Sequence, residues 1–181
     1  MHDRPHLNVK LKFPRVYIYI NISLAIIFLM ISPSHSKEKR IVGWLELARI
    51  HPENFLIRAK LDTGAKNSSI NAENIHVFRR DKRRWVRFEV TNYLGHKSII
   101  ERKIRRTVRI KEHYTEYQKR FVIKLELCVG DHYKEVDVNI ADRSNFDYPL
   151  LIGRSFMDGD LLIDTSMQFT TEPNCRKEAA P

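Results

Sequence analysis

The sequence predicts a small all-β protein, a barrel or a sandwich, that contains one short helix. Along most of the chain, short segments place an apolar residue at every second position, as half-buried strands do. No stretch keeps the helical spacing of apolar residues, except for a brief segment near residues 155–158. Many short strands separated by regular turns favour an all-β architecture over a mixed one.

The predicted strands follow one another along the chain with turn residues between them. The segments with strand periodicity are residues 41–47, 55–61, 85–90, 99–110, 120–129 and 134–140. Gly130 and Asp131 are expected to form a tight hairpin between the last two of these strands. A buried apolar run over residues 148–152 precedes the short helix, and a closing strand and turn are expected around Asp164.

The first 36 residues have the layout of a secretory signal peptide. Basic residues precede an apolar run over residues 16–31, and small residues occupy the −3 and −1 positions of a cleavage site before Lys37. A membrane span needs about 20 apolar residues, so this run is short for one. An uncleaved N-terminal anchor is the alternative, and it is the only membrane contact that the sequence predicts. In both cases we expect the domain to lie in a bacterial periplasm.

The rest of the chain divides into a predicted domain, residues 37–170, and a polar tail, residues 171–181. The whole chain carries a formal net charge of +10 and contains two cysteines, Cys128 and Cys175. An oxidising compartment would allow them to pair. Because Cys175 lies in the polar tail, however, we expect two separate thiols, with a disulfide as the alternative.

One short motif, Asp62-Thr63-Gly64, follows directly after the strand over residues 55–61. Glycine allows the sharp turn because it reaches backbone angles that are costly for other residues. Asp and Thr suit the same turn, since their side chains bond to nearby backbone groups. The result is a carboxylate at the end of a rigid strand, which is a favourable place for a reactive group. An ordinary surface turn is the alternative for an Asp-Thr-Gly tripeptide taken by itself.

A second motif far downstream favours the reactive interpretation. The apolar run before Gly153 and Arg154 leads into a short apolar turn of helix. Together the two motifs resemble those of the retropepsin-like aspartic peptidases, with residues 61–65 as the catalytic turn and residues 150–154 as the strand behind it. Further segments resemble one bacterial family, labelled ATP-dependent zinc proteases, that includes proteins associated with modification of a ribosomal protein. These further segments are residues 66–69, 120–123 and 141–144. The resemblance covers roughly residues 40–170 and implies a closed barrel.

The resemblance also implies a catalytic mechanism. An aspartic peptidase uses two carboxylates that share one proton, one as a base toward water and the other as an acid toward the carbonyl. After the leader the chain has one Asp-Thr-Gly, so two copies of Asp62 must meet across the two-fold axis of a homodimer. Thr63 would brace the two turns, and the Gly64 N–H would bond the carboxylate. The predicted catalytic residues are Asp62, Thr63 and Gly64, and the predicted substrate-binding residues are Ala65, Lys66 and Arg154.

Several residues near these motifs allow more than one interpretation. Asp164 could be a degenerate second catalytic aspartate, but a closing strand and turn is the favoured interpretation. Arg143 could line the cleft or form a local ion pair. Arg154 could also bind an acidic group near the base of the dimer. The segment 92–96 is the best candidate for a hairpin that covers the site.

The zinc and ATP in the family label have no support in the residues themselves. The chain contains no His-Glu-x-x-His motif, and its histidines are scattered among turn residues. It also contains no glycine-rich phosphate loop. We therefore expect no metal and no cofactor.

Two basic runs, residues 79–84 and 102–106, complete the list of candidate features. They are expected to be solvated loops or edge strands, since no base-stacking motif accompanies them and no nucleic-acid partner is expected. Basic clefts also concentrate acidic substrates, and the resembling family is linked to glutamate ligation.

The predicted function is therefore that of an exported aspartic endopeptidase that hydrolyses peptide bonds, including those of glutamate-rich peptides. The alternative is a non-catalytic periplasmic binding domain that has the same barrel and recognises an acidic peptide or partner.

Overall fold

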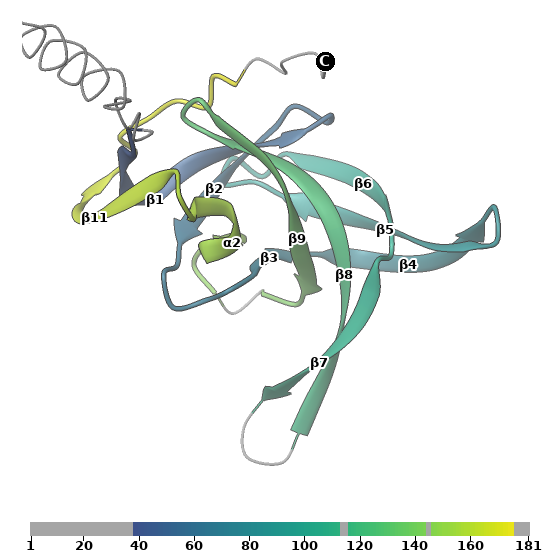
Figure 1. Ribbon diagram of the computed structural model, residues 1–181. Helices are drawn as coiled ribbons and strands as arrows, with labels where there is room; N and C mark the ends of the chain where they lie inside the picture. The colour runs from purple at the N-terminus through teal and green to yellow at the C-terminus, as the bar shows by residue number, and fades with distance from the viewer. Residues whose placement is uncertain (1–37, 113–115, 144–145, 176–181) are drawn as a thin grey trace, which may run out of the picture. The chain divides into compact units, whose positions relative to one another are not determined.

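The computed structural model describes residues 38–112, 116–143 and 146–175, so the predicted leader lies outside the described part of the chain (Figure 1). The elements in order are β1 (Arg40–His51), β2 (Phe55–Leu61), β3 (Ser68–Asn71), β4 (Glu73–Arg80), β5 (Arg83–Thr91), β6 (Lys97–Lys103), β7 (Arg106–Glu112), β8 (Glu116–Val129), β9 (His132–Ala141), β10 (Leu150–Ile152), α2 (Arg154–Met157) and β11 (Leu161–Gln168). In these ranges, no helix has the length and apolar character that a membrane span needs.

Six strands close into a barrel. The hydrogen-bonded order is β1, β2, β10, β3, β9 and β8, and β8 pairs back to β1 opposite Arg49–His51. The strand β11 lies parallel to β1 outside the ring, and β7 pairs with the outer part of β8. Closure leaves no free edge within the ring itself. The predicted all-β closed barrel with one short helix is confirmed.

Alternating side chains fill the barrel, as the sequence periodicity predicts. In β2, Ile57, Ala59 and Leu61 are buried, whereas Arg58 and Lys60 are exposed. This alternation follows from the geometry of a strand, in which successive side chains point to opposite faces. The resulting core also includes fully buried side chains from β8, β9, β10 and α2, among them Leu125, Leu127, Val138, Ile152 and Phe156. Burial of this apolar surface is the main force that holds the barrel together.

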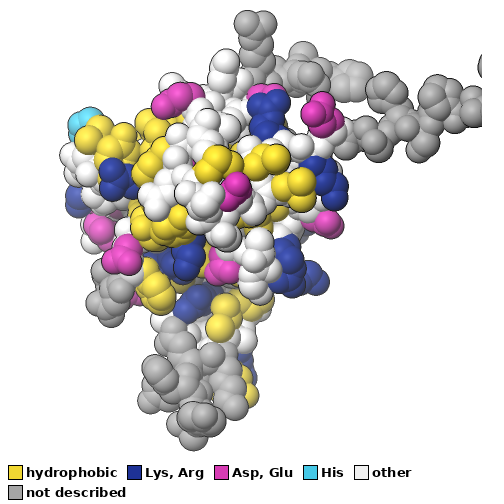
Figure 2. Space-filling model, turned by 90° about the vertical axis from the view of Figure 1, so that its left-hand side faces the viewer, with side chains coloured by type: hydrophobic (Ala, Val, Ile, Leu, Met, Phe, Trp, Pro, Cys, Tyr) yellow, Lys and Arg dark blue, Asp and Glu magenta, His cyan; other side chains and the backbone are white. Residues whose placement is uncertain are grey.

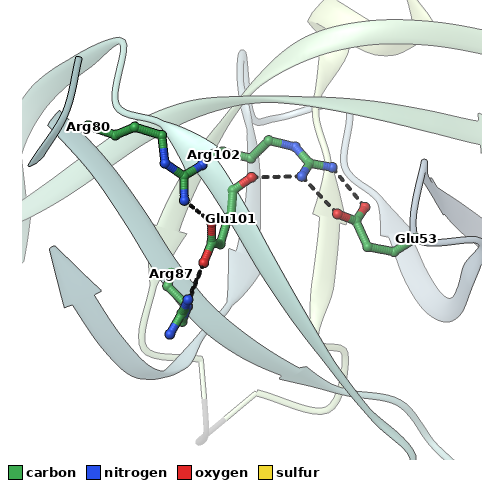
Figure 3. Close-up of polar contacts among 5 residues, drawn as sticks. All are labelled: Glu53, Arg80, Arg87, Glu101 and Arg102. Carbon is green, nitrogen blue, oxygen red and sulfur yellow. Dashed lines mark hydrogen bonds and ion pairs between the residues drawn. The ribbon is translucent and has the colours of Figure 1, made fainter. Parts of the chain in front are cut away.

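A second sheet, formed by β4, β5 and β6, packs against one side of the barrel (Figure 1). Its inner face contributes Val86, Phe88 and Ile100 to the same core. An ion pair fixes the sheet to the β1–β2 turn, since the Arg102 guanidinium donates to both carboxylate oxygens of Glu53 at 2.7 and 2.8 Å (Figure 3). Such two-pronged pairs are geometrically specific.

The chain passes from this second sheet to the barrel between β6 and β7. Residues 99–110 were expected to form one strand, but the structure divides them at Ile104. The Ile104 N–H donates to Arg84 O of β5, whereas the Arg105 N–H donates to Val122 O of β8. Because consecutive residues bond to different sheets, one strand becomes two.

Two further strands, β3 and β4, could not be recognised from the periodicity of apolar residues, for different reasons. In β3, three of four residues are buried, so no alternation is visible. In β4, seven of eight residues are exposed because the strand has only β5 as a neighbour. The predicted hairpin at Gly130 and Asp131 is confirmed, with Val129 opposite His132 and a positive φ of 57° at Gly130.

The cysteines form a disulfide, so the expectation of two separate thiols is wrong. Residues 169–175, here called the C-terminal strap, run back over the barrel, and the Asn174 N–H donates to Gly130 O at 2.6 Å. This path brings Cys175 to Cys128 although the two lie 47 residues apart. The polarity of the tail had suggested a free segment, but a polar segment can be anchored by hydrogen bonds.

The strap has a buried partner in Glu46, which is 0% exposed. One carboxylate oxygen of Glu46 accepts from the Gly43 N–H at 2.7 Å and from the Thr170 N–H at 3.0 Å. The other oxygen accepts from the Thr171 N–H at 3.2 Å. Polar residues in the strap therefore satisfy a carboxylate that would be costly to bury alone.

Candidate active site

The Asp-Thr-Gly turn begins where β2 ends. The Asp62 N–H donates to Ile152 O of β10 at 2.8 Å, which fixes the start of the turn. The carboxylate then folds back, and its Oδ1 accepts from the Gly64 N–H at 2.9 Å and from the Ala65 N–H at 3.3 Å. Two backbone donors thus hold the Asp62 side chain in one orientation. The Gly64 contact is the one that the sequence resemblance implies.

The second motif lies directly behind this turn. The Gly153 N–H donates to Ser68 Oγ, and a Cβ at Gly153 would lie 2.7 Å from the Asn67 carbonyl. The Arg154 N–H donates to Ala65 O at 2.9 Å, and the Ser155 N–H donates to Lys66 O at 3.0 Å. Glycine is required here because the backbone of residues 66–67 passes too close for any side chain.

Arg154 also reaches the turn through its side chain. Its Nη1 donates to Thr63 O at 2.7 Å and to Gly64 O at 2.9 Å. Among the described residues, Arg154 forms no ion pair with a carboxylate, so the acidic partner that the sequence suggested is not found within one chain. The guanidinium instead holds the two carbonyls that follow Asp62, and its role in substrate binding stays a prediction.

A cleft of about 800 Å³ opens beside the turn. Thr63, Lys66 and Arg154 line it, and Leu162 and Ile163 of β11 contribute apolar surface. Figure 2, which views the molecule from the side of β11 and β1, shows hydrophobic side chains interspersed with both basic and acidic side chains on this face. Of the predicted substrate-binding residues, Lys66 and Arg154 line the cleft, whereas Ala65 does not and instead bonds through its backbone to the Asp62 carboxylate and to the Arg154 N–H.

Arg143 is a further charged group near the turn. It follows the end of β9, is only 8% exposed, and donates through Nη1 to Ser69 Oγ at 3.0 Å. Its guanidinium also lies 4.4 Å from the centre of the Phe146 ring. Burial and the neighbouring charge of Arg120 lower the pKa of Arg143, and the opposite charge of Asp62 acts against this shift.

Asp164 lies within β11, opposite Gly43 of β1. Its Oδ1 accepts from the Ser166 N–H at 2.8 Å and from Ser166 Oγ at 2.6 Å, and these bonds lower the pKa of Asp164. The pairing of β1 with β11 is irregular at this point, since Leu45 pairs with Gln168. Asp164 therefore lies in an irregular part of the strand, in line with the interpretation as a closing strand and turn.

The segment proposed to cover the site does not do so. Residues 92–96 form the turn between β5 and β6, and Asn92 Nδ2 donates to Leu56 O at the start of β2. Asp62 follows the other end of that strand, roughly 20 Å away at 3.3 Å per residue. The hairpin of β7 and β8 instead projects from the barrel (Figure 1). Its strand β8 carries Arg120, whose charge acts on Arg143. Sequence periodicity identified β8 but not this projection.

In the described ranges, no group of three or more His, Cys, Asp or Glu side chains is arranged to hold a metal ion.

A six-stranded closed barrel, with an Asp-Thr-Gly turn set against a Gly-Arg strand and a short helix, defines a retropepsin-like protein. The family model described as "RimB-like: Retropepsin-like aspartic endopeptidase RimB" matches residues 41–174, and the chain belongs to this family. The resemblance seen in the sequence is confirmed.

The chain is also similar to proteins that are named for a ligase and not for a peptidase, and to one solved structure. A "Probable alpha-L-glutamate ligase" of Shewanella halifaxensis is 36% identical over 116 residues, which is 62% of this chain and 25% of that protein. A protein with the same name from Desulfotalea psychrophila is 32% identical over 140 residues, or 72% of this chain and 29% of its own length. The chain thus spans less than a third of the length of these relatives.

A crystal structure of a Legionella pneumophila protein of unknown function is 33% identical, with a TM-score of 0.65. It matches 75% of this chain and the whole of that structure.

Proposed function

We propose that this protein is a peptide hydrolase of the aspartic type, in which two copies of Asp62 from two chains activate a water molecule. The observation that carries the proposal is the Asp62 carboxylate, held by the N–H groups of Gly64 and Ala65 at the end of β2. The adjoining cleft of about 800 Å³ has room for a peptide segment. Family membership supports the same assignment.

The proposed reaction uses the two carboxylates in different protonation states. The ionised Asp62 accepts a proton from water, and the resulting hydroxide bonds to the peptide carbonyl carbon while the protonated Asp62 donates its proton to the carbonyl oxygen. The tetrahedral intermediate then breaks its C–N bond. The leaving nitrogen takes up the proton that the first carboxylate received from water, and the second carboxylate regains its own proton from the intermediate.

A homodimer is part of the proposal because one chain supplies one such turn. Thr63 and Gly64 are exposed and so available to a second copy. Apolar side chains lie exposed in the flanking strands, with Ile41 of β1 58% and Leu162 of β11 49% exposed. Among the described strands, β11 pairs only with β1, so one of its edges is available. A two-fold axis beside this edge would place like residues opposite each other.

We further propose that the substrate is rich in carboxylates. The relatives above carry the name "Probable alpha-L-glutamate ligase", which links proteins similar to this chain to glutamate. Lys39, Lys66 and Arg154 line the cleft, with Asp158 as its one acidic side chain. Positive charge of this kind raises the local concentration of an acidic peptide.

The Cys128–Cys175 disulfide supports the proposal that the domain works outside the cytoplasm. Disulfides persist mainly in oxidising compartments. The layout of the first 36 residues predicts the same compartment.

The test is cleavage profiling by mass spectrometry on a peptide library that includes glutamate-rich sequences. Asp62→Asn should lower peptide hydrolysis by roughly 100-fold or more, because a group that transfers protons contributes about this much. Asp164→Asn is the matched control and should keep native activity. Equal activity of native and Asp62→Asn protein would disprove the mechanism, and loss in Asp164→Asn would place the second carboxylate within the same chain. Binding of acidic peptides without any cleavage would favour a non-catalytic binding domain.

A further inference from the structure

The two basic runs of the sequence come together in the second sheet. Residues 79–84 surround the turn between β4 and β5, and residues 102–106 span the junction of β6 and β7. Trp85 pairs with Lys103 across β5 and β6, and the Ile104 N–H donates to Arg84 O at 2.9 Å. Segments that are 20 residues apart in the sequence thus form one surface.

This surface is hollowed in two adjoining places. One hollow, of about 330 Å³, is lined by Lys82, Arg83, Arg84, Lys103, Ile104, Arg105, Arg106 and Thr107. A second, of about 240 Å³, shares Lys103 and Arg105 with the first. No acidic side chain lines the larger hollow, whereas Glu126 and Glu135 line the smaller one. Neither hollow shares a lining residue with the cleft beside Asp62.

Some of the basic side chains here are already neutralised. Figure 3 shows Arg80 and Arg87 directed to the carboxylate of Glu101, and Arg102 paired with Glu53. Arg106 is likewise paired with Asp137. Carboxylates within the fold therefore already balance the charges of these four arginines.

The other five cations that line the larger hollow have no such partner among the described residues. We define the basic groove by Lys82, Arg83, Arg84, Lys103 and Arg105. Within the described ranges, none of the five forms an ion pair with a carboxylate. Like charges held this close repel one another, so a bound polyanion would relieve the repulsion.

We propose that the basic groove binds an extended, carboxylate-rich segment of a polypeptide at a site separate from the Asp62 cleft. The choice of a polypeptide rests on the proposed peptidase function. An extended chain places a residue about every 3.3 Å, so successive glutamates could meet several of the five cations. The groove would hold the acidic part of a substrate while another part enters the cleft.

The aromatic rings next to the groove argue against nucleic acid. Binding of single strands without a fixed sequence uses open aromatic faces on which bases stack. Here the Arg80 guanidinium lies 4.8 Å from the centre of the Trp85 ring and 5.2 Å from that of Phe78. Arg84 lies 5.4 Å from the centre of the Phe121 ring. Each ring thus already carries a guanidinium on one face.

The experiment measures binding separately from cleavage. The full chain with Asp62→Asn is titrated against a fluorescein-labelled oligoglutamate peptide by fluorescence anisotropy, at low and at high salt. Arg83→Gln combined with Arg105→Gln should weaken binding about five- to tenfold at low salt, which is the effect expected of two exposed ion pairs. The binding should also weaken for the parent as salt rises.

The matched control is Arg49→Gln combined with Arg58→Gln, which lowers the net charge equally but alters β1 and β2. It should change the dissociation constant by less than about twofold, since surface charges away from the groove are screened. An equal loss in the two double variants, or no loss in the groove variant, would overturn the proposal. Tighter binding of a single-stranded RNA of matched charge would also overturn it in favour of a nucleic-acid partner.

Cleavage by the native chain separates this proposal from the proposed function. If the native chain hydrolyses peptides but the groove variant binds as tightly as the parent, the peptidase function is supported and the groove proposal is disproved. If binding depends on the groove but the native chain cleaves no peptide, the groove proposal is supported and the peptidase proposal is disproved.

Discussion

Arg154 connects two motifs that lie about 90 residues apart in the sequence. Its Nη1 donates to the carbonyl oxygens of Thr63 and Gly64. These carbonyls follow Asp62, so the guanidinium restricts the turn that orients the carboxylate. A reactive group must be held in a narrow range of positions, and small displacements are costly to the rate.

We expect Arg154→Met to lower kcat for peptide hydrolysis about tenfold with little change in KM, because the turn loses both bonds. Arg154→Lys should recover part of the loss, since one ammonium can still donate to a carbonyl. Steady-state kinetics on a cleaved peptide would measure both variants, with thermal unfolding as a check on the fold. A rise in KM with kcat unchanged would instead assign Arg154 to substrate binding.

The ionisation of a single residue, Glu101, is expected to make the stability of the fold depend on pH. Hydrogen bonds from Arg80 and then from Arg87 lower the pKa of Glu101 below its ordinary value of 4.5. A carboxylate whose pKa is lower in the folded state than in the unfolded state stabilises the fold at pH values above its ordinary pKa. This contribution is lost as the pH falls through the pKa of the folded state.

Glu101→Gln should therefore lower the melting temperature at neutral pH, and the difference from the native protein should shrink as the pH falls below 4.5. Thermal unfolding followed by circular dichroism across this range would measure it. The ion pairs are exposed, so the effect should be small. A difference that stays constant across the range would contradict this role for Glu101.

The C-terminal strap acts at the scale of an element. It satisfies the buried carboxylate of Glu46 through Thr170 and Thr171, and the Cys128–Cys175 disulfide fixes its end. The strap also follows directly after β11, whose residues line the cleft. If the strap came loose, the Glu46 carboxylate would lose the hydrogen bonds that it accepts from the N–H groups of the strap.

We expect Cys128→Ser combined with Cys175→Ser to lower the free energy of unfolding by about 2–4 kcal/mol, because the unfolded chain regains the freedom of a long loop. Urea unfolding would measure this, and a reducing agent should have the same effect on the native protein. Each single Ser variant should match the double variant, since each removes the same bond. Unchanged stability under reducing conditions would show that the hydrogen bonds alone hold the strap.

At the scale of the whole molecule, the proposed activity depends on two chains. Each described chain offers one Asp-Thr-Gly turn, with exposed apolar side chains on the nearby strands β1 and β11. A closed two-fold dimer would place the two turns opposite each other and cover these side chains.

Native protein mixed with an equal amount of Asp62→Asn protein should have, after exchange, about one quarter of the activity of native protein at the same total chain concentration. The reason is that only dimers of two native chains hold two carboxylates. Activity per chain should also fall on dilution, in parallel with dimer dissociation measured by sedimentation. A mixture that keeps half of the activity would mean that each chain works independently of its partner.

Much of the fold could be predicted because its information is local. The alternation in β2 follows from which side chains are buried, and the turn after it follows from the side chain of Asp62. The expected special backbone angles of Gly64 are not seen, since its φ is not positive; a Cβ there would instead lie 3.1 Å from Asp62 Oδ1. The strand β4 could not be found in this way because seven of its eight residues are exposed. The division between β6 and β7 could not either, since it depends on which sheet accepts two consecutive N–H groups.

The sequence by itself determined the all-β class and most of the strands, and its resemblance to the retropepsin-like peptidases implied the closed barrel and the pairing of the Asp62 turn with the Gly153–Arg154 motif. These depend on residue periodicity and on motifs whose residue types are physically constrained. Only the tertiary structure decided the Cys128–Cys175 disulfide, the cover of Glu46 by the strap, and the union of the two basic runs. The physical reason is that each of these contacts joins segments distant in the chain, and long-range register depends on how the entire core packs.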